Sequence, residues 1–184
     1  MEFTSKHHPI KISRFFFSIL ILCISMTVHA QTINSEASKA TFQIKNLRIN
    51  TVEGSLTGMN GTINFSPDDL QNSNFNVCVD ANTINTGIDK RDEHLKKDDF
   101  FGTANYPQIC FESTSISSTN SGYSATGNLI MNGISKSVTI PFTFENNQFI
   151  GNMDLKRLDY NVGKGTGKFL VGGEVNVQII CTLN

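Results

Sequence analysis

An alternation of apolar and polar residues with a period of two runs through this chain and constrains its fold more than any other feature. It is clear in residues 40–44, 62–65, 75–81, 138–144, 152–155 and 174–181. Successive side chains of a β-strand point to opposite faces of the sheet, so the pattern predicts strands with one apolar and one polar face. We therefore expect an all-β fold.

Short turn sequences separate these segments. Asn60-Gly61 and Asn132-Gly133 supply the positive φ angles of a type I′ hairpin turn, and Asn146-Asn147 is a weaker case. The serine- and asparagine-rich residues 113–124 are expected to form a long hairpin tip. Serial strands joined in this way predict an extended, lipocalin-like antiparallel β-barrel of about eight strands.

One charged segment, residues 89–101, breaks the alternation and predicts a short helix packed on the barrel. Asp89 is a plausible N-cap and Gly102 a plausible terminator. Two interpretations remain open for this helix. It covers one side or end of the barrel as a solvated element, or its Arg91 and His94 meet the polar head of a ligand.

The first thirty residues have the composition of a Sec-type signal peptide. Basic residues precede an apolar run of about fourteen residues, Phe15–Val28, and small Ala30 offers a cleavage point. A membrane-spanning helix needs about twenty apolar residues, so the run is short for an anchor. We expect cleavage after Ala30, a periplasmic or secreted product, and one β-barrel domain over residues 31–184.

The charge of the remaining chain argues against several partners. Of 15 Lys and Arg residues three precede Gln31, and of 16 Asp and Glu residues one does, which leaves 12 basic against 15 acidic residues. This balance gives no reason to expect nucleic acid as a partner. No second apolar segment is long enough for stable membrane insertion.

Three cysteines follow the signal segment: Cys78, Cys110 and Cys181. Cys78 and Cys110 each point away from the apolar face of their segment, so they could lie opposite each other on neighbouring strands and form a disulfide. Two free thiols are the alternative. Cys181 continues an apolar face and is expected to be buried.

Phenylalanine dominates the faces expected to point inward. Ten of the 14 Phe residues follow Gln31, and the chain has no Trp. A barrel of about eight strands either fills with side chains or holds one small ligand, and the sequence leaves both open. The candidates for lining a tunnel are Phe42, Ile44, Ile63, Phe65, Phe75, Val77, Val79, Ile109, Phe111, Leu129, Met131, Ile140, Phe142, Met153, Val175 and Val177, with Leu95 and Phe100 from the helical segment.

Catalysis has little support. The chain from Gln31 onward has one histidine, His94, which excludes a His-rich metal site and a two-histidine relay. No nucleophile elbow, phosphate loop or dinucleotide fingerprint is present. We expect no enzyme, no metal and no cofactor.

Several motifs resemble the YceI-like family. They are Arg91-Asp92-x-His94-Leu95, then Asp99-Phe100-Phe101, then Tyr106-Pro107-x-Ile109-x-Phe111-x-Ser113, with Gly127-x-Leu129-x-Met131-x-Gly133 and Arg157-x-Asp159-Tyr160 downstream. The three cysteines are not part of the family's general pattern. The resemblance covers nearly all of residues 31–184.

The resemblance implies a barrel with a tunnel for a long isoprenoid lipid, either an isoprenoid quinone or a polyprenyl phosphate, and often a homodimer. A lipid carrier would place Arg91, His94 and Arg157 at the mouth as head-group contacts. Arg157 could instead pair with Asp159 or with a carboxylate at a strand edge. The alternative function is a secreted interaction or stress-protection module with a filled core and no small-molecule ligand.

Overall fold

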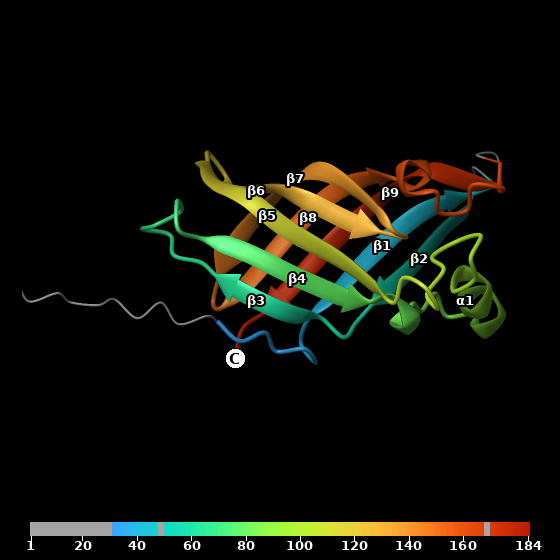
Figure 1. Cartoon of the computed structure of the whole chain (residues 1–184), viewed down its shortest axis with the longest axis horizontal. Helices are drawn as coiled ribbons and strands as arrows, with labels where there is room; N and C mark the ends of the chain where they lie inside the picture. The colour runs from blue at the N-terminus through green and yellow to red at the C-terminus, as the bar shows by residue number, and fades with distance from the viewer. Residues whose placement is uncertain (1–30, 48–49, 168–169) are drawn as a thin grey trace, which may run out of the picture.

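The computed structural model describes residues 31–47, 50–167 and 170–184, which form one curled antiparallel sheet (Figure 1). Its strands are β1 (Lys39–Asn46), β2 (Asn50–Leu56), β3 (Asn60–Asn64), β4 (Asn74–Asp80), β5 (Gln108–Thr119), β6 (Gly122–Met131), β7 (Ile134–Glu145), β8 (Gln148–Lys156) and β9 (Val171–Thr182). One α-helix, α1 (Asp89–Leu95), and two 3-10 helices, η1 (Ala81–Thr83) and η2 (Arg157–Tyr160), complete the fold. The predicted all-β barrel with one short helix is confirmed. The signal segment lies outside the described residues.

The sheet has nine strands where about eight were expected, because one strand is broken in two. The order is β2-β1-β9-β8-β7-β6-β5-β4-β3, so the two edge strands follow each other in the chain. They are joined by residues 57–59, where Gly58 has a φ of 68°. The two edge strands are not paired with each other, and we call the gap between these edges the seam. Single bridges between Gln31 and Ile63 and between Ile33 and Leu183 link the N-terminal segment to the sheet on both sides of the seam. The seam is thus closed by short links in place of a continuous ladder.

The turn predictions are partly correct. Asn132, Gly133, Asn146 and Asn147 all have positive φ angles and join β6 to β7 and β7 to β8, as expected. The prediction for Asn60-Gly61 was wrong, because both residues lie in β3 and pair with β4. A glycine is needed there for a different reason: a Cβ on Gly61 would lie 2.1 Å from the backbone oxygen of Asn76.

The serine- and asparagine-rich segment is not a long tip. It belongs to β5 and β6, which pair up to Thr119–Gly122 and leave only residues 120–121 in the turn. The hydroxyls of Ser117 and Ser124 meet across the two strands at 3.0 Å. Polar side chains on both faces therefore do not prevent pairing here, because cross-strand hydrogen bonds hold them.

Helix α1 is shorter than predicted, and its N-terminus is held in a different way. The N-cap position is Ile88, which makes no side-chain cap hydrogen bond. Instead the buried carboxylate of Asp92 accepts hydrogen bonds from the backbone N–H of Thr86, at 2.9 Å, and from the Thr86 hydroxyl. After Leu95 the chain continues in turns, and Gly102, with a φ of 55°, donates its N–H to Lys97 at 2.9 Å.

The structure joins Cys78 and Cys110 in a disulfide between directly opposed residues of β4 and β5. Cys181 on β9 is a free, buried thiol. Burial raises the pKa of Cys181 to about 11, and a hydrogen bond with Ser38 offsets part of this rise. A thiol of this pKa stays protonated and unreactive near neutral pH.

We predict that the number of reactive thiols in a chain of residues 31–184 depends on the Cys78–Cys110 disulfide and on the burial of Cys181. At about pH 8 a thiol-specific dye should label no cysteine in the folded protein, because thiolates alone react quickly. It should label one cysteine, Cys181, in denaturant without reductant, and three after reduction. Three labelled cysteines in denaturant alone would show that the disulfide does not form.

Candidate functional site: an apolar cavity inside the barrel

A cavity of about 600 Å³ occupies the inside of the curled sheet. Its lining draws on all nine strands, on α1 and on η2. Most of the lining side chains are apolar, so the cavity offers van der Waals contact and few hydrogen bonds. The interior is therefore hollow, which settles the choice between a filled and an open barrel that the sequence left open.

The exposure of the inward-facing side chains supports the same conclusion. Phe42, Val77, Phe111, Met153 and Val175 all line the cavity, yet each is only half-buried. In a close-packed core such residues would be fully covered by their neighbours. Here they have apolar surface that no other side chain of the described residues covers.

The structure brings together most of the residues nominated from the sequence. The nominated residues that line the cavity are Phe42, Ile44, Ile63, Phe75, Val77, Val79, Leu95, Phe100, Ile109, Phe111, Leu129, Met131, Ile140, Phe142, Met153, Val175 and Val177. The prediction for Phe65 was wrong, because Phe65 does not line the cavity. It is buried beyond the end of the cavity, because alternation along a strand predicts a face and not a depth along the barrel axis.

The cavity also has lining residues that were not nominated, among them Met59, Phe149 and Tyr160. Leu155 and Ile179, which alternation places on the same faces as Met153 and Val177, line the cavity as well. Met59 lies in the break between β2 and β3, and Tyr160 lies in η2. Neither position has an alternation pattern that would reveal it.

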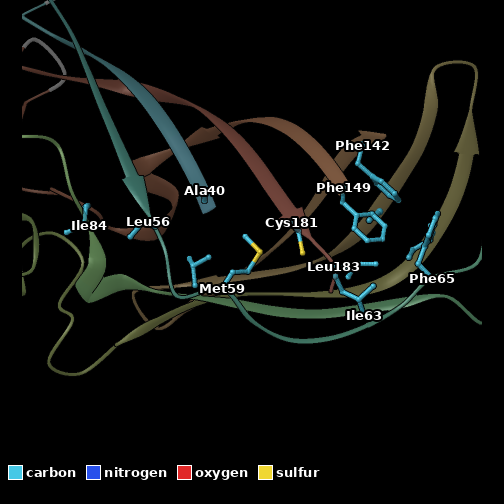
Figure 2. Packing of buried hydrophobic residues seen from close by; sticks show 13 residues of the cluster. Ala40, Leu56, Met59, Ile63, Phe65, Ile84, Phe142, Phe149, Cys181 and Leu183 are labelled. Carbon is cyan, nitrogen blue, oxygen red and sulfur yellow. The ribbon is translucent and has the colours of Figure 1, made fainter. Parts of the chain in front are cut away.

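An aromatic cluster closes one end of the cavity. The ring of Phe65 lies 5.1–6.0 Å, centroid to centroid, from the rings of Phe75, Tyr123, Phe142, Phe144 and Phe149. Most of these pairs are edge-to-face, which is a favoured geometry for aromatic rings. Figure 2 shows Phe65, Phe142 and Phe149 gathered together, with Cys181 and Met59 farther along the interior. We call Phe65 and the five rings around it, those of Phe75, Tyr123, Phe142, Phe144 and Phe149, the aromatic plug.

The opposite end of the cavity lies beside α1. Figure 1 shows α1 at the end of the barrel away from the C-terminus and from the end of β3, which Phe65 follows. The charged side chains among the lining residues are Lys45, Lys90, Arg91, His94 and Arg157, the histidine being charged only when protonated. No Asp or Glu is among the described lining residues, although the Asp99 carboxylate lies 3.1 Å from the His94 ring.

Arg91 and His94 lie at this mouth, but each already has a partner. Arg91 donates from Nε to the Thr86 hydroxyl at 2.7 Å and from Nη2 to the Thr86 carbonyl at 2.8 Å. The Nε2 atom of His94 lies 3.1 Å from a carboxylate oxygen of Asp99. Both side chains remain accessible enough to meet a ligand, since Arg91 is half-buried and His94 is exposed.

Arg157 cannot serve as a head-group contact, and it does not pair with Asp159. Its guanidinium is buried and donates all five of its N–H groups to backbone carbonyls, those of Val162, Gly163, Thr166, Val171 and Gly172, at 2.7–3.0 Å. Burial lowers the pKa of Arg157 from its ordinary value. Arg157 thus holds the loop that leads into β9, and no donor is left for a ligand.

The hydrogen-bonded wall of the cavity is incomplete between β7 and β8. The ladder between these strands covers only Phe142–Glu145 and Gln148–Gly151, and it stops next to Pro141, which has no N–H to donate. Tyr160 and Val162 pack there against Leu129 and Met131. The side-chain amide of Asn132 donates to the Tyr160 carbonyl at 3.1 Å and ties η2 to the β6–β7 turn.

Two further features bear on other functions. Within residues 31–47, 50–167 and 170–184, no group of three or more His, Cys, Asp or Glu side chains could hold a metal ion. In the same residues no helix is both long and apolar enough to cross a membrane.

Comparison with known proteins places this site in context. Residues 31–183 match the YceI-like domain. A UPF0312 protein of Yersinia pestis (strain Pestoides F) is 32% identical over 136 residues, which cover 68% of this chain and 71% of that protein.

Solved structures share the fold. BcnA of Burkholderia cenocepacia has a TM-score of 0.73 and 26% identity, and the match covers 81% of this chain and 98% of that one. The YCEI protein of Campylobacter jejuni has a TM-score of 0.64 and 23% identity, over 77% and 90%. A polyisoprenoid binding domain from Saccharophagus degradans, implicated in plant cell wall breakdown, has a TM-score of 0.64 and 17% identity, over 84% and 98%.

We predict that Arg157→Lys lowers the free energy of unfolding by about 3 kcal/mol, because an ammonium cannot reach five carbonyls and leaves several of them buried without a partner. Urea denaturation followed by circular dichroism measures the change. Arg91→Lys is the matched control, since Arg91 makes two hydrogen bonds at a more exposed position. Equal effects of the two substitutions would contradict the role assigned to Arg157.

Proposed function

This chain belongs to the YceI-like family, and from that premise we propose that it is a carrier that encloses the tail of a long-chain isoprenoid lipid inside its barrel. The observation on which the proposal rests is the open cavity with half-buried apolar side chains along its length. The structural similarity to the polyisoprenoid binding domain from Saccharophagus degradans supports the choice of lipid. No catalytic role is proposed for any residue.

A hydrocarbon tail gains free energy when it moves from water into the cavity. Each methylene that leaves water for an apolar site contributes about 0.8 kcal/mol. A tail inside the cavity would also cover the exposed surface of inward side chains such as Phe42 and Phe111. Both changes favour binding without a specific hydrogen bond, which suits a ligand that has no polar group along its tail.

The charges at the mouth favour one class of head group. Lys45 and Lys90 border the cavity together with Arg91 and His94, and no carboxylate lies among the lining residues. An anionic head such as that of a polyprenyl phosphate would gain from this border, whereas a neutral quinone head would not. We therefore propose a polyprenyl phosphate ahead of an isoprenoid quinone.

The alternative function, an interaction module with a filled core, requires an interior without room for a ligand. The cavity of about 600 Å³ has the size of a ligand-binding pocket. The cavity thus supports the carrier function, and no feature of the described residues favours the alternative.

We propose that the protein acts after export, in the periplasm or outside the cell, with residues 1–30 as the signal peptide. The Cys78–Cys110 disulfide suits an oxidising compartment. When the full chain is expressed in a bacterial host, N-terminal sequencing of the exported protein should begin at Gln31. Ala30→Leu should reduce cleavage, because the cleavage site requires a small residue. A product that stays in the cytoplasm with an intact N-terminus would contradict this proposal.

The carrier function can be tested by blocking the cavity. Val77→Phe places a larger apolar side chain in the cavity, and we expect it to reduce co-purifying isoprenoid lipid at least tenfold while the protein stays folded. Solvent extraction and mass spectrometry measure the lipid, and circular dichroism checks the fold.

Asn76→Phe is the matched control, because Asn76 is the neighbouring, outward-facing and exposed residue of β4. It should leave the lipid content unchanged. Recovery of a folded, lipid-free wild-type protein that also fails to bind added prenyl alcohols would exclude the carrier function.

A further inference from the structure

We infer that the aromatic plug acts as a length stop that limits the enclosed tail to about twenty carbons, or four isoprene units. The inference rests on the proposed function and adds to it the size of the ligand that the cavity accepts. It also assigns a role in specificity to Phe65, which touches the ligand site only through other rings.

The plug is built from several strands at once. Phe75 comes from β4, Tyr123 from β6, Phe142 and Phe144 from β7, and Phe149 from β8. Phe65, which follows β3, lies at their centre and contacts all five rings. Phe75, Phe142 and Phe149 line the cavity, while Phe65, Tyr123 and Phe144 do not. The cavity therefore ends at the first three rings, and the other three lie behind them.

The backbone behind Phe65 is also fixed. The side-chain amide of Gln31 donates to the Phe65 carbonyl at 3.4 Å, and the backbone N–H of Ser66 donates to the Ser73 hydroxyl at 3.0 Å. Gln31 also forms a β-bridge with Ile63. Phe65 is thus held from behind as well as from the sides, and a ligand tail cannot displace it without breaking these contacts.

The volume of the cavity sets the length of chain that fits. A chain carbon with its hydrogens takes about the room of one water molecule, roughly 30 Å³. A cavity of about 600 Å³ then holds about twenty carbons, which is four isoprene units.

The depth of the cavity agrees with this volume. Along β9 the lining residues run from Val171 to Cys181. Ten steps of about 3.3 Å, on a strand tilted by about 40°, correspond to a depth of roughly 25 Å. Four isoprene units have about sixteen carbons in line and extend to roughly 20 Å, given C–C bonds of about 1.5 Å.

The stop has a thermodynamic consequence. A tail enters towards the plug, and units added after the cavity is full remain in water at the mouth. Each methylene that is buried contributes about fourfold to the affinity, and each methylene left in water contributes nothing. The affinity should therefore rise with chain length and then reach a plateau.

The test measures dissociation constants for prenyl alcohols of 10, 15, 20, 30 and 45 carbons, by displacement of a fluorescent fatty-acid probe at fixed detergent concentration. For the wild-type protein we expect at least a tenfold gain for each isoprene unit up to about twenty carbons and less than threefold in total beyond that length. Alcohols are used so that the head group stays the same and uncharged across the series.

Phe65→Ala should extend the cavity and shift the plateau towards 30 carbons, with at least a tenfold gain for the C30 alcohol relative to the C20 alcohol. Because the loss of a central buried ring could unfold the protein, Phe65→Leu is the second variant, with at least a threefold gain expected. Tyr106→Leu is the matched control, since Tyr106 is an exposed aromatic residue that does not line the cavity, and its truncation should leave the plateau in place.

The outcomes separate this inference from the proposed function. If no alcohol of any length binds to the folded protein, the carrier function fails and the length stop fails with it. If the alcohols bind and the wild-type affinity keeps rising beyond twenty carbons, the carrier function stands and the length stop is excluded. A plateau that stays the same in a folded Phe65 variant and in the Tyr106→Leu control would exclude Phe65 as the stop.

Discussion

The hydrogen-bonded ladder around the barrel is the interaction on which the rest of the structure depends. A globular domain usually gains most of its stability from a filled core, but the middle of this barrel is hollow. The backbone groups must therefore be paired around almost the whole circumference, because an unpaired N–H or C=O in the wall would face an apolar cavity. Buried side chains form two clusters. One contains the buried rings of the aromatic plug and continues along the interior through Cys181, Met59 and Leu56, and the other consists of Phe100, Leu129, Met131, Tyr160 and Val162.

The places where the ladder is interrupted show the same constraint. At the seam between β2 and β3, the chain uses single bridges from Gln31 and Ile33. Between β7 and β8 the ladder stops at Phe142–Gly151, and η2 covers the opening with Tyr160 and Val162. Arg157 supports this cover, because its guanidinium donates to five backbone carbonyls between Val162 and Gly172. A buried charge without a carboxylate is costly unless it is fully hydrogen-bonded, and here the five carbonyls satisfy it.

The sequence predicted the direction of side chains better than their depth or their partners. Alternation identifies the inward face of a strand, so residues such as Val77 and Val175 could be placed at the interior from the pattern alone. It gives no position along the barrel axis, and Phe65 was therefore expected in the tunnel wall and not in the plug. The basic character of Arg157 suggested a head-group contact. Its actual partners are backbone carbonyls brought together by a loop, and no local pattern encodes them. Asn60-Gly61 has the composition of a turn, but the close approach of Asn76 explains the glycine.

The two ends of the cavity differ in a way that orients a guest. Beside α1 the lining has basic side chains and no carboxylate, whereas at the plug the cavity is lined by the rings of Phe75, Phe142 and Phe149. An amphiphile that entered head first would lose the hydration of its polar group against the aromatic plug and gain no hydrogen bond there. One that entered tail first would bury its hydrocarbon and keep its head in water near Lys45 and Lys90. The asymmetry of the cavity therefore favours a single direction of entry, and it makes the plug the part of the wall that the end of the tail meets.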